Sequence, residues 1–268
     1  MRLLLVCATL MELRACLSPL PAPDAPEAAA AYEAAYAGGH AWLDPPPALR
    51  LSGCTLDLLV CGVGPVASAL ALGRFLGRET CRSAPLLRGI LNLGLAGSYD
   101  IEAAPLGSLV LATEEVYPEY GVRPHPPHPE DGQEKLPLPL GFPQAEIEGQ
   151  KVFDRLPLAP ESALGNMGLN WHSKWRQGAS VTVAGVSGTP ERAGRLASLC
   201  GGITENMEGF PLALGAAMAG IPFMELRAVS NAAGLRPPQG WDMPAALAAL
   251  GRGTRDLLAP FLPVDTPR

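Results

Sequence analysis

The chain has few aromatic residues and no concentration of positive charge. Aromatic residues make up 6% of its 268 residues, and 20 Lys and Arg stand against 26 Asp and Glu, a formal net charge of −6. The basic residues form no cluster, whereas a nucleic-acid surface needs a basic patch. The balance therefore predicts no nucleic-acid partner and favours a small-molecule site.

The sequence also lacks paired cysteines and long apolar runs. None of its six cysteines forms a C-x-x-C pair, which predicts reduced, buried thiols in a cytoplasmic protein. No apolar run approaches membrane-spanning length. Residues 1–16 resemble a lipoprotein signal ending at Cys16, but Glu12 and Arg14 interrupt the apolar stretch where a cleavage region is neutral. We expect a first strand there and no membrane association.

Short apolar segments alternate with Ala- and Leu-rich segments. The apolar segments show no strict alternation, which indicates strands covered on both faces; they occupy residues 3–9, 56–64, 89–97, 107–116, 179–186 and 222–231. Helices are expected at 65–79, 207–220 and 243–261. This order predicts an α/β fold, a single domain with a central mixed, mostly buried sheet flanked by helices.

Two Pro-rich segments, 17–50 and 117–143, interrupt this order. We expect them to be insertions in one domain of residues 1–268, the first an extended connection with one short helix. The second contains His125 and His128 in a His-Pro-Pro-His sequence. A metal could suit that spacing, but no nearby Cys or regular scaffold accompanies it, so we expect a solvated loop. No metal or redox cofactor is expected.

Two glutamates stand at predicted element ends. Glu208 precedes a helix that should begin near Gly209, because Pro211 is tolerated only in a first turn. Such a helix start can face a ligand at the carboxyl ends of strands. Acids are also favoured at helix N-termini by the macrodipole. Glu12, after the first strand, is either a site residue or a solvated side chain. Taken alone, both residues favour the purely structural interpretation.

Glycine pairs end two of the predicted strands. They occur at Gly62-Val63-Gly64 and in the G-L-A-G sequence of residues 94–97. Neither completes G-x-G-x-x-G, because Ala67 takes the last position of the first. Glycines at strand ends let a ligand approach the backbone. Plain turns explain them equally well.

Taken in their order along the chain, these motifs indicate a function more specifically than any one of them does alone. A strand-one acid, Gly-x-Gly, G-L-A-G, N-M-E-G before a helix and R-A-V-S-N after it resemble the nucleoside phosphorylase and nucleosidase family. The resemblance covers roughly residues 1–15 and 55–261. It implies a homo-oligomeric enzyme that cleaves the N-glycosidic bond of a nucleoside. It also implies that Glu12 orients or deprotonates water, that Glu208 holds the ribose hydroxyls, and that the substrate is lined by Ala96, Gly97, Asn206 and Met207.

Asn231 ends the last predicted strand, where family members acting on 6-aminopurines carry Asp. Cleavage leaves negative charge on the base, which a donor or proton at N7 relieves. An amide suits a 6-oxopurine, because its NH₂ donates to O6 and its carbonyl accepts from N7–H. The residue therefore favours hypoxanthine or guanine as the base. Asn as a simple turn residue is the alternative.

The nucleophile is expected to be water. Leu95 stands where family members often have a small hydroxyl residue, and the G-L-A-G turn has no Arg to bind phosphate. The A-T-x-x-E start (8–12), G-T-P-E-R (188–192) and E-N-M-E-G (205–209) are similar to the futalosine-hydrolysing subgroup of the family. That resemblance implies release of hypoxanthine from futalosine, on a route to menaquinone. The 5′ benzoate would then need aromatic or basic residues, for which the candidates are Phe153, Trp171, His172, Lys174 and Arg176.

Three alternatives remain open. One is a purine nucleoside phosphorylase acting on 6-oxopurine nucleosides, which would depend on phosphate. Another is a nucleosidase of the methylthioadenosine/S-adenosylhomocysteine type, which would release adenine. The third is a noncatalytic nucleoside-binding lipoprotein, whose processing at Cys16 would remove Glu12.

Overall fold

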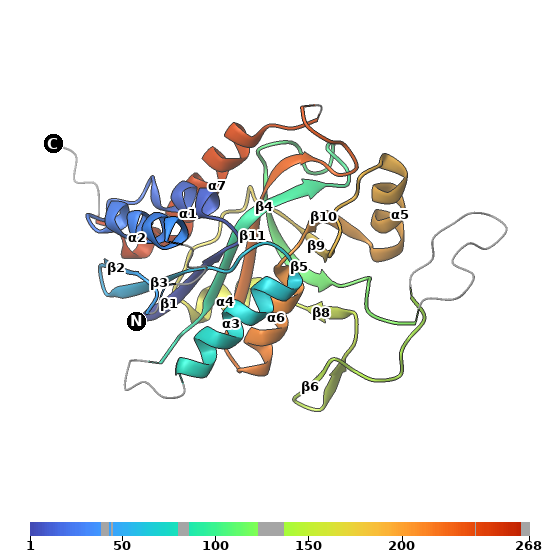
Figure 1. Ribbon diagram of the computed structural model, residues 1–268, viewed down its shortest axis with the longest axis horizontal. Coiled ribbons are helices and arrows are strands. Elements are labelled where there is room, and N and C mark those ends of the chain that lie inside the picture. The colour runs from blue at the N-terminus through green and yellow to red at the C-terminus, as the bar shows by residue number, and fades with distance from the viewer. Residues whose placement is uncertain (39–42, 44, 80–85, 123–136, 239, 264–268) are drawn as a thin grey trace.

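The computed structural model describes residues 1–38, 43, 45–79, 86–122, 137–238 and 240–263. In this part of the chain a nine-stranded mixed sheet forms the centre, with helices on both faces (Figure 1). The predicted α/β class with a buried mixed sheet is confirmed. The sequence His125–His128 lies outside the described residues.

The sheet follows the order β10-β9-β5-β11-β4-β1-β3-β2, and β8 pairs with β5. Its strands are β1 (Arg2–Cys7), β2 (Ala48–Leu51), β3 (Cys54–Val60), β4 (Ile90–Ser98), β5 (Leu109–Val116), β8 (Arg155–Pro157), β9 (Arg176–Thr182), β10 (Gly202–Asn206) and β11 (Phe223–Ala232). A separate hairpin consists of β6 (Ala145–Ile147) and β7 (Gln150–Val152). Six of these strands overlap the six predicted ones.

Five of the strands form a closed circle of paired neighbours. β10 pairs with β9 and also, antiparallel, with β4. The sequence of neighbours β4, β11, β5, β9 and β10 therefore returns to β4. We call these five strands the ring. Strands β1, β3 and β2 extend the sheet beyond β4, and we call them the wing.

Helices cover the sheet on its two faces. They are α1 (Leu10–Leu17), α2 (Ala25–Ala37), α3 (Pro65–Glu79), α4 (Pro160–Asn166), α5 (Pro190–Cys200), α6 (Gly209–Met218) and α7 (Met243–Leu258), which continues as the 3₁₀ turn η1 (Ala259–Phe261). The predicted helices 65–79, 207–220 and 243–261 correspond to α3, α6 and α7 with η1. Every helix formed by the described residues is too short or too polar to span a membrane.

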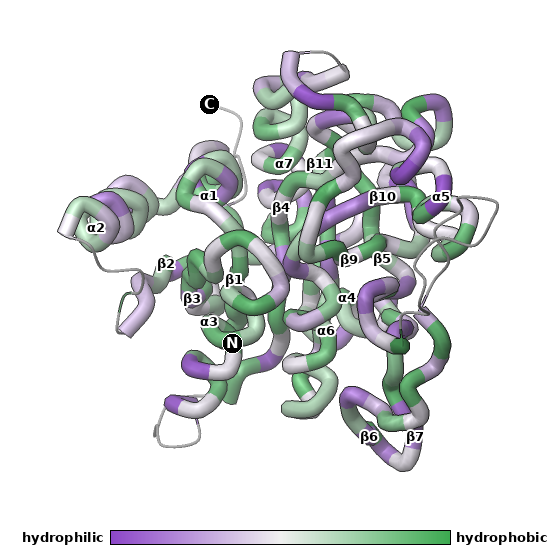
Figure 2. Tube along the Cα trace, turned by 45° about the vertical axis from the view of Figure 1, so that its right-hand side comes forward, coloured by the Kyte–Doolittle hydropathy of each residue, from purple (hydrophilic) through white to green (hydrophobic). Residues whose placement is uncertain are grey.

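Strand β1 shows why the sheet needs cover on both faces. Leu3 and Leu5 pack into one apolar cluster with residues of α1, α2 and α7, whereas Leu4 and Val6 pack into another with α3 and α6. Successive side chains of a strand point to opposite faces, so an unbroken apolar run must be buried twice. In Figure 2, β1 is accordingly mostly green, while much of the β6–β7 hairpin is purple.

Helices α1 and α5 were not predicted, although each carries a start signal. Thr9 accepts from the Glu12 N–H while the Glu12 carboxylate accepts from the Thr9 N–H, a reciprocal capping box. Thr189 caps α5 through its side chain alone, which accepts from the Arg192 N–H, with Pro190 in the first turn. The short apolar run of residues 3–9 hid the first signal, because the strand ends at Cys7 and the helix cap, Thr9, follows only two residues later.

Candidate active site

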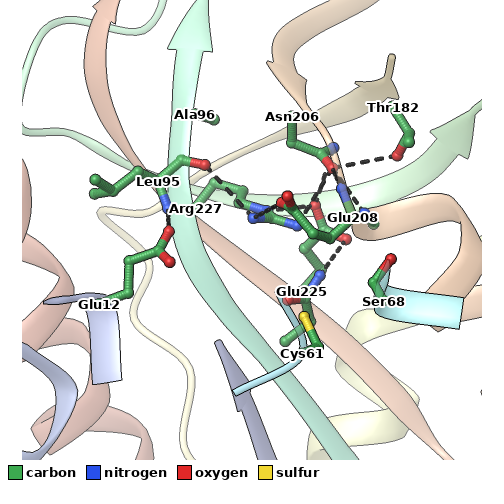
Figure 3. A network of polar contacts seen from close by, with 12 residues as sticks. Glu12, Cys61, Ser68, Leu95, Ala96, Thr182, Asn206, Glu208, Glu225 and Arg227 are labelled. Atoms are coloured by element: carbon green, nitrogen blue, oxygen red, sulfur yellow. Dashed lines mark hydrogen bonds and ion pairs between the residues drawn. The ribbon is translucent and has the colours of Figure 1, made fainter. Parts of the chain in front are cut away.

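The interior of the ring is polar. Each of its five strands contributes at least one buried polar side chain; these are Asn92, Glu115, Ser180, Thr182, Thr204, Asn206, Glu225 and Arg227. Hydrogen bonds connect them across the ring. Figure 3 shows those that link Arg227, Glu225, Asn206 and Thr182. Buried polar groups persist only when they are paired, so the five strands are held in one arrangement by these bonds.

Arg227 lies at the centre of this network. On β11, Glu225 and Arg227 are two residues apart and share a face, while Leu226 packs into the apolar cluster behind. Arg227 Nε donates to Glu225 Oε1 at 2.9 Å, and Nη2 donates to Asn206 Oδ1 at 3.3 Å. Burial lowers the pKa of Arg227, but the charges of Glu225 and Glu208 outweigh this and raise it above its usual value. Arg227 is therefore a charged group.

Asn206 ends β10 and holds the start of α6. Its Oδ1 accepts from the backbone N–H groups of Glu208 at 2.8 Å and Gly209 at 2.7 Å. Its Nδ2 donates to Glu115 Oε1 at 2.9 Å and to Ser180 Oγ at 2.8 Å. Both ends of the amide are thus engaged within the protein. The predicted start of the helix at Gly209 is confirmed.

Glu208 is buried at that helix start, with 5% of its surface exposed. Its Oε1 accepts from the Gly64 N–H at 3.0 Å, and its Oε2 lies 3.5 Å from Arg227 Nη1. Gly64 has φ of +97°, a conformation that only glycine adopts readily. Burial raises the pKa of Glu208, and Arg227 partly opposes this shift. The Gly-x-Gly sequence therefore presents a backbone donor to the carboxylate.

Glu12 reaches the same region from α1. Its Oε2 accepts from the Thr9 backbone at 2.8 Å and hydroxyl at 2.7 Å, and its Oε1 accepts from the Leu95 N–H at 2.9 Å. A Cβ at Gly94 would lie 3.0 Å from Glu12 Oε1 and 2.6 Å from Arg227 Nη1. The glycine of the G-L-A-G sequence thus makes room for Glu12 and Arg227 together.

Asn231 lies beside Gly97, its partner in the register of β11 and β4. The Ser230 hydroxyl donates to Asn231 Oδ1 at 2.9 Å, and Asn231 Nδ2 donates to the Ala232 carbonyl at 3.0 Å. Because a carbonyl oxygen can only accept, this contact assigns the two ends of the amide. One N–H and one lone pair of Asn231 remain for a ligand.

The carboxyl ends of β1, β3, β4 and β11 explain this convergence. The four strands run parallel, so Glu12, Gly64, Gly97 and Asn231 emerge at one edge of the sheet, where α/β proteins bind ligands. β10 runs antiparallel to β4 and carries Asn206 and Glu208 back toward the same edge. Met207, between them, is half-buried.

The candidates for a 5′ pocket are not gathered at this edge. Thr182, at the end of β9, contacts the network, whereas Arg176 begins that strand. Six strand residues span about 20 Å, so Arg176 and the exposed Trp171 lie away from Glu208. His172 and Lys174, in the same segment before β9, are exposed as well. Phe153 lies between β7 and β8 and is half-buried.

Sequence reasoning missed Arg227, Glu225 and Glu115 as members of the site. A signal was present, since each is a charged residue inside a run that otherwise reads as a buried strand. Buried charges are rare unless paired. Among the described residues, no cluster of His, Cys, Asp and Glu has the geometry to hold a metal.

Comparisons with known proteins give relatives both in sequence and in fold. The family model of the phosphorylase superfamily matches residues 48–256. A futalosine hydrolase of Thermus thermophilus is 37% identical over 209 residues, which are 78% of this chain and 84% of that protein. One of Streptomyces coelicolor is 34% identical over 198 residues, covering 72% and 74% of the two chains.

Solved structures share the fold. A 5′-methylthioadenosine/S-adenosylhomocysteine nucleosidase of Helicobacter pylori, with butyl-thio-DADMe-Immucillin-A, has a TM-score of 0.65 at 14% identity, covering 97% of this chain and 98% of that one. A futalosine hydrolase mutant of the same species has a TM-score of 0.61 at 16% identity, covering 95% and 98%. At these identities the likeness concerns the fold alone.

Proposed function

The chain belongs to the phosphorylase superfamily and, within it, to the futalosine hydrolases, and from this premise we propose that it hydrolyses the N-glycosidic bond of futalosine. The products are hypoxanthine and dehypoxanthine futalosine. The observation that carries the proposal is the 37% identity to a futalosine hydrolase over 84% of that protein's length.

Each side chain at the edge of the sheet takes a role in the proposed reaction. Glu12 orients or deprotonates the attacking water, and Glu208 accepts hydrogen bonds from the ribose hydroxyls. As the bond to the base breaks, the sugar gains positive charge, which nearby carboxylates stabilise. Met207 packs against the sugar, and Ala96 and Gly97 line the site. Asn206 supports Glu208 through the helix start.

Asn231 is the proposed reader of the base. Its free N–H donates to O6 of hypoxanthine, and its free lone pair accepts from N7–H once the leaving base is protonated. Both groups point from an amide that Ser230 and the Ala232 carbonyl already hold in one orientation. Less ordering is therefore needed when the substrate binds. No metal or redox cofactor takes part in this scheme.

Water is the proposed nucleophile. Leu95 offers its backbone N–H to Glu12, and its side chain provides no hydroxyl for phosphate. Release of hypoxanthine from futalosine, measured with and without inorganic phosphate, tests this. Equal release in both buffers is the expected result. Release only with phosphate would make the protein a phosphorylase, and no release in either buffer would refute the futalosine assignment.

The setting of the enzyme is also part of the proposal. We infer that residues 1–268 act as one unit, with the Pro-rich segments 17–50 and 117–143 as insertions. The candidates for binding the 5′ benzoate are not gathered at the edge of the sheet in the described part of the chain, which favours a homo-oligomer whose neighbouring subunit completes the pocket. A reduced set of buried cysteines supports a cytoplasmic location.

A further inference from the structure

Two carboxyl groups meet inside the ring with no surface exposure. Glu115 on β5 and Glu225 on β11 are both 0% exposed. A Cβ at Gly209 would lie 2.1 Å from Glu115 Oε1 and 2.4 Å from Glu225 Oε2. Both oxygens therefore press against the same glycine. Asn206 Nδ2 links them, at 2.9 Å from Glu115 Oε1 and 3.5 Å from Glu225 Oε1.

The charges around this pair do not balance if every acid is ionised. Glu115, Glu225 and Glu208 surround Arg227, which is the one cation in contact with this cluster among the residues that the structure describes. Glu12 on α1 adds a further carboxylate near Glu208, and Cys61 after β3 is a thiol. Like charges cannot both persist at short range in a dry interior. At least one acid must hold a proton.

The partners of the two carboxyl groups decide which one holds it. Glu225 accepts from Arg227 Nε at 2.9 Å and from Asn92 Nδ2 at 3.1 Å. Glu115 accepts from the Thr182 hydroxyl at 2.6 Å and from Asn206 Nδ2, both neutral donors. Glu225 is thus the carboxyl group whose anion is paired with a cation.

We propose that Glu115 is a neutral carboxylic acid that donates its proton to Glu225, and that Glu225, as the anion, is a positioning residue that orients Arg227 for Glu208. Burial raises the pKa of Glu115 well above its usual value, and the charge on Glu225 raises it further, in line with this arrangement. Glu225 contacts no substrate. It acts through Arg227, which faces Glu208 at 3.5 Å.

The arrangement has two consequences. First, folding takes up one proton at neutral pH, because Glu115 is ionised in the unfolded chain. Second, the Glu225 charge keeps the pKa of Glu208 higher than Arg227 alone would leave it. The second consequence bears on catalysis only if Glu208 binds ribose, and so it rests on the proposed function. The first does not.

Measuring unfolding as a function of pH tests whether Glu115 holds a proton in the folded protein. A raised pKa in the folded state means that stability is present below the unfolded pKa, near 4.3, and is lost as pH rises. Between pH 5 and 7 the unfolding constant of the wild type should rise about tenfold per pH unit relative to that of Glu115→Gln, because the amide needs no proton. Glu114→Gln, at the neighbouring residue paired with Arg155, should retain the wild-type slope. Equal slopes for wild type and Glu115→Gln would overturn the proposal.

Kinetics test the positioning role. Glu225→Gln should lower kcat/KM on futalosine by about 10- to 100-fold, because Arg227 loses its charged partner. It should also move the acidic limb of the pH profile to lower pH. Glu115→Gln keeps a neutral donor to Glu225, so its acidic limb should stay in place. An unchanged limb in Glu225→Gln would overturn the positioning role. An inactive wild type that still shows the unfolding slope would instead refute the proposed function and leave the proton in place.

Discussion

The wing and the ring of the same sheet differ in what they bury. In the wing, the leucine side chains of β1 and β3 pack into two apolar clusters. Arg2 and Asp57 form a buried ion pair between these two strands. In the ring, each strand turns at least one polar side chain inward. Apolar burial is non-directional, whereas hydrogen bonds have partners and angles. The comparison teaches that the wing of this sheet mainly stabilises the fold, whereas the ring mainly positions side chains at the site. Three substitutions test the separation.

Glu208→Gln, at the start of α6 just after ring strand β10, should have the largest effect on catalysis. It removes the charge that faces Arg227 and, in the proposed reaction, the developing positive charge on the sugar. Turnover of futalosine should fall by at least about 100-fold. The melting temperature should stay near that of the wild type, because a neutral amide replaces a carboxyl group that burial already makes costly to ionise. Glu161→Gln, an exposed acid in the first turn of α4, is the matched control and should leave turnover unchanged. Near-wild-type turnover of Glu208→Gln would remove that residue from the site.

Asn231→Asp should change the preference for the purine base more than it changes the overall rate of hydrolysis. An aspartate would place a carboxyl oxygen against the Ala232 carbonyl, where Nδ2 now donates, so that oxygen must be protonated or turn away. Use of futalosine should drop by about tenfold or more, as expected when a hydrogen-bond donor to the substrate is lost. The 6-amino counterpart of futalosine should become a better substrate relative to it. Release of hypoxanthine and of adenine, measured side by side, gives this ratio. A ratio equal to that of the wild type would contradict the role of Asn231.

Leu5→Ala in the wing should have the smallest effect on catalysis. The side chain is fully buried, so its loss should cost about 2–5 kcal/mol of unfolding free energy. Turnover per folded molecule should be unchanged, since Leu5 belongs to an apolar cluster outside the polar network. Chemical denaturation and active-site-normalised rates measure the two quantities. The exposed Val66→Ala should change neither. A large loss of turnover in folded Leu5→Ala would break the separation of ring and wing.

The fold was largely predictable because apolar runs in the sequence indicate which strands and helices are buried. The strand predicted at 222–231 corresponds to Phe223–Ala232, and the helix predicted at 65–79 has those bounds. The strand predicted at 179–186 lies three to four residues too far along the chain, since β9 is Arg176–Thr182. Its first residues, Arg176 and Gln177, are polar and exposed. These two residues pair with β5 alone, because the pairing of β9 with β10 begins at Ala179, so little apolar sequence is needed there.

The site was predictable only in part. Glu12, Glu208 and Asn231 follow short motifs, and the structure brings their elements to one edge of the sheet. Glu115 and Thr182 belong to no motif and are placed by β5 and β9, which reach the site through pairings distant in sequence. Their side chains also come after irregularities in the register. Local patterns carry no information on such pairings.

The sequence by itself determined which segments are buried and where helices can start, because hydrophobic periodicity and capping residues act locally. It also determined the motifs that mark the family. Only the tertiary structure decided that β10 returns to β4, that five polar faces then point into one interior, and that three acids share one arginine there. The physical reason is that a hydrogen bond or ion pair depends on the distance between its partners, and those partners come from strands far apart along the chain.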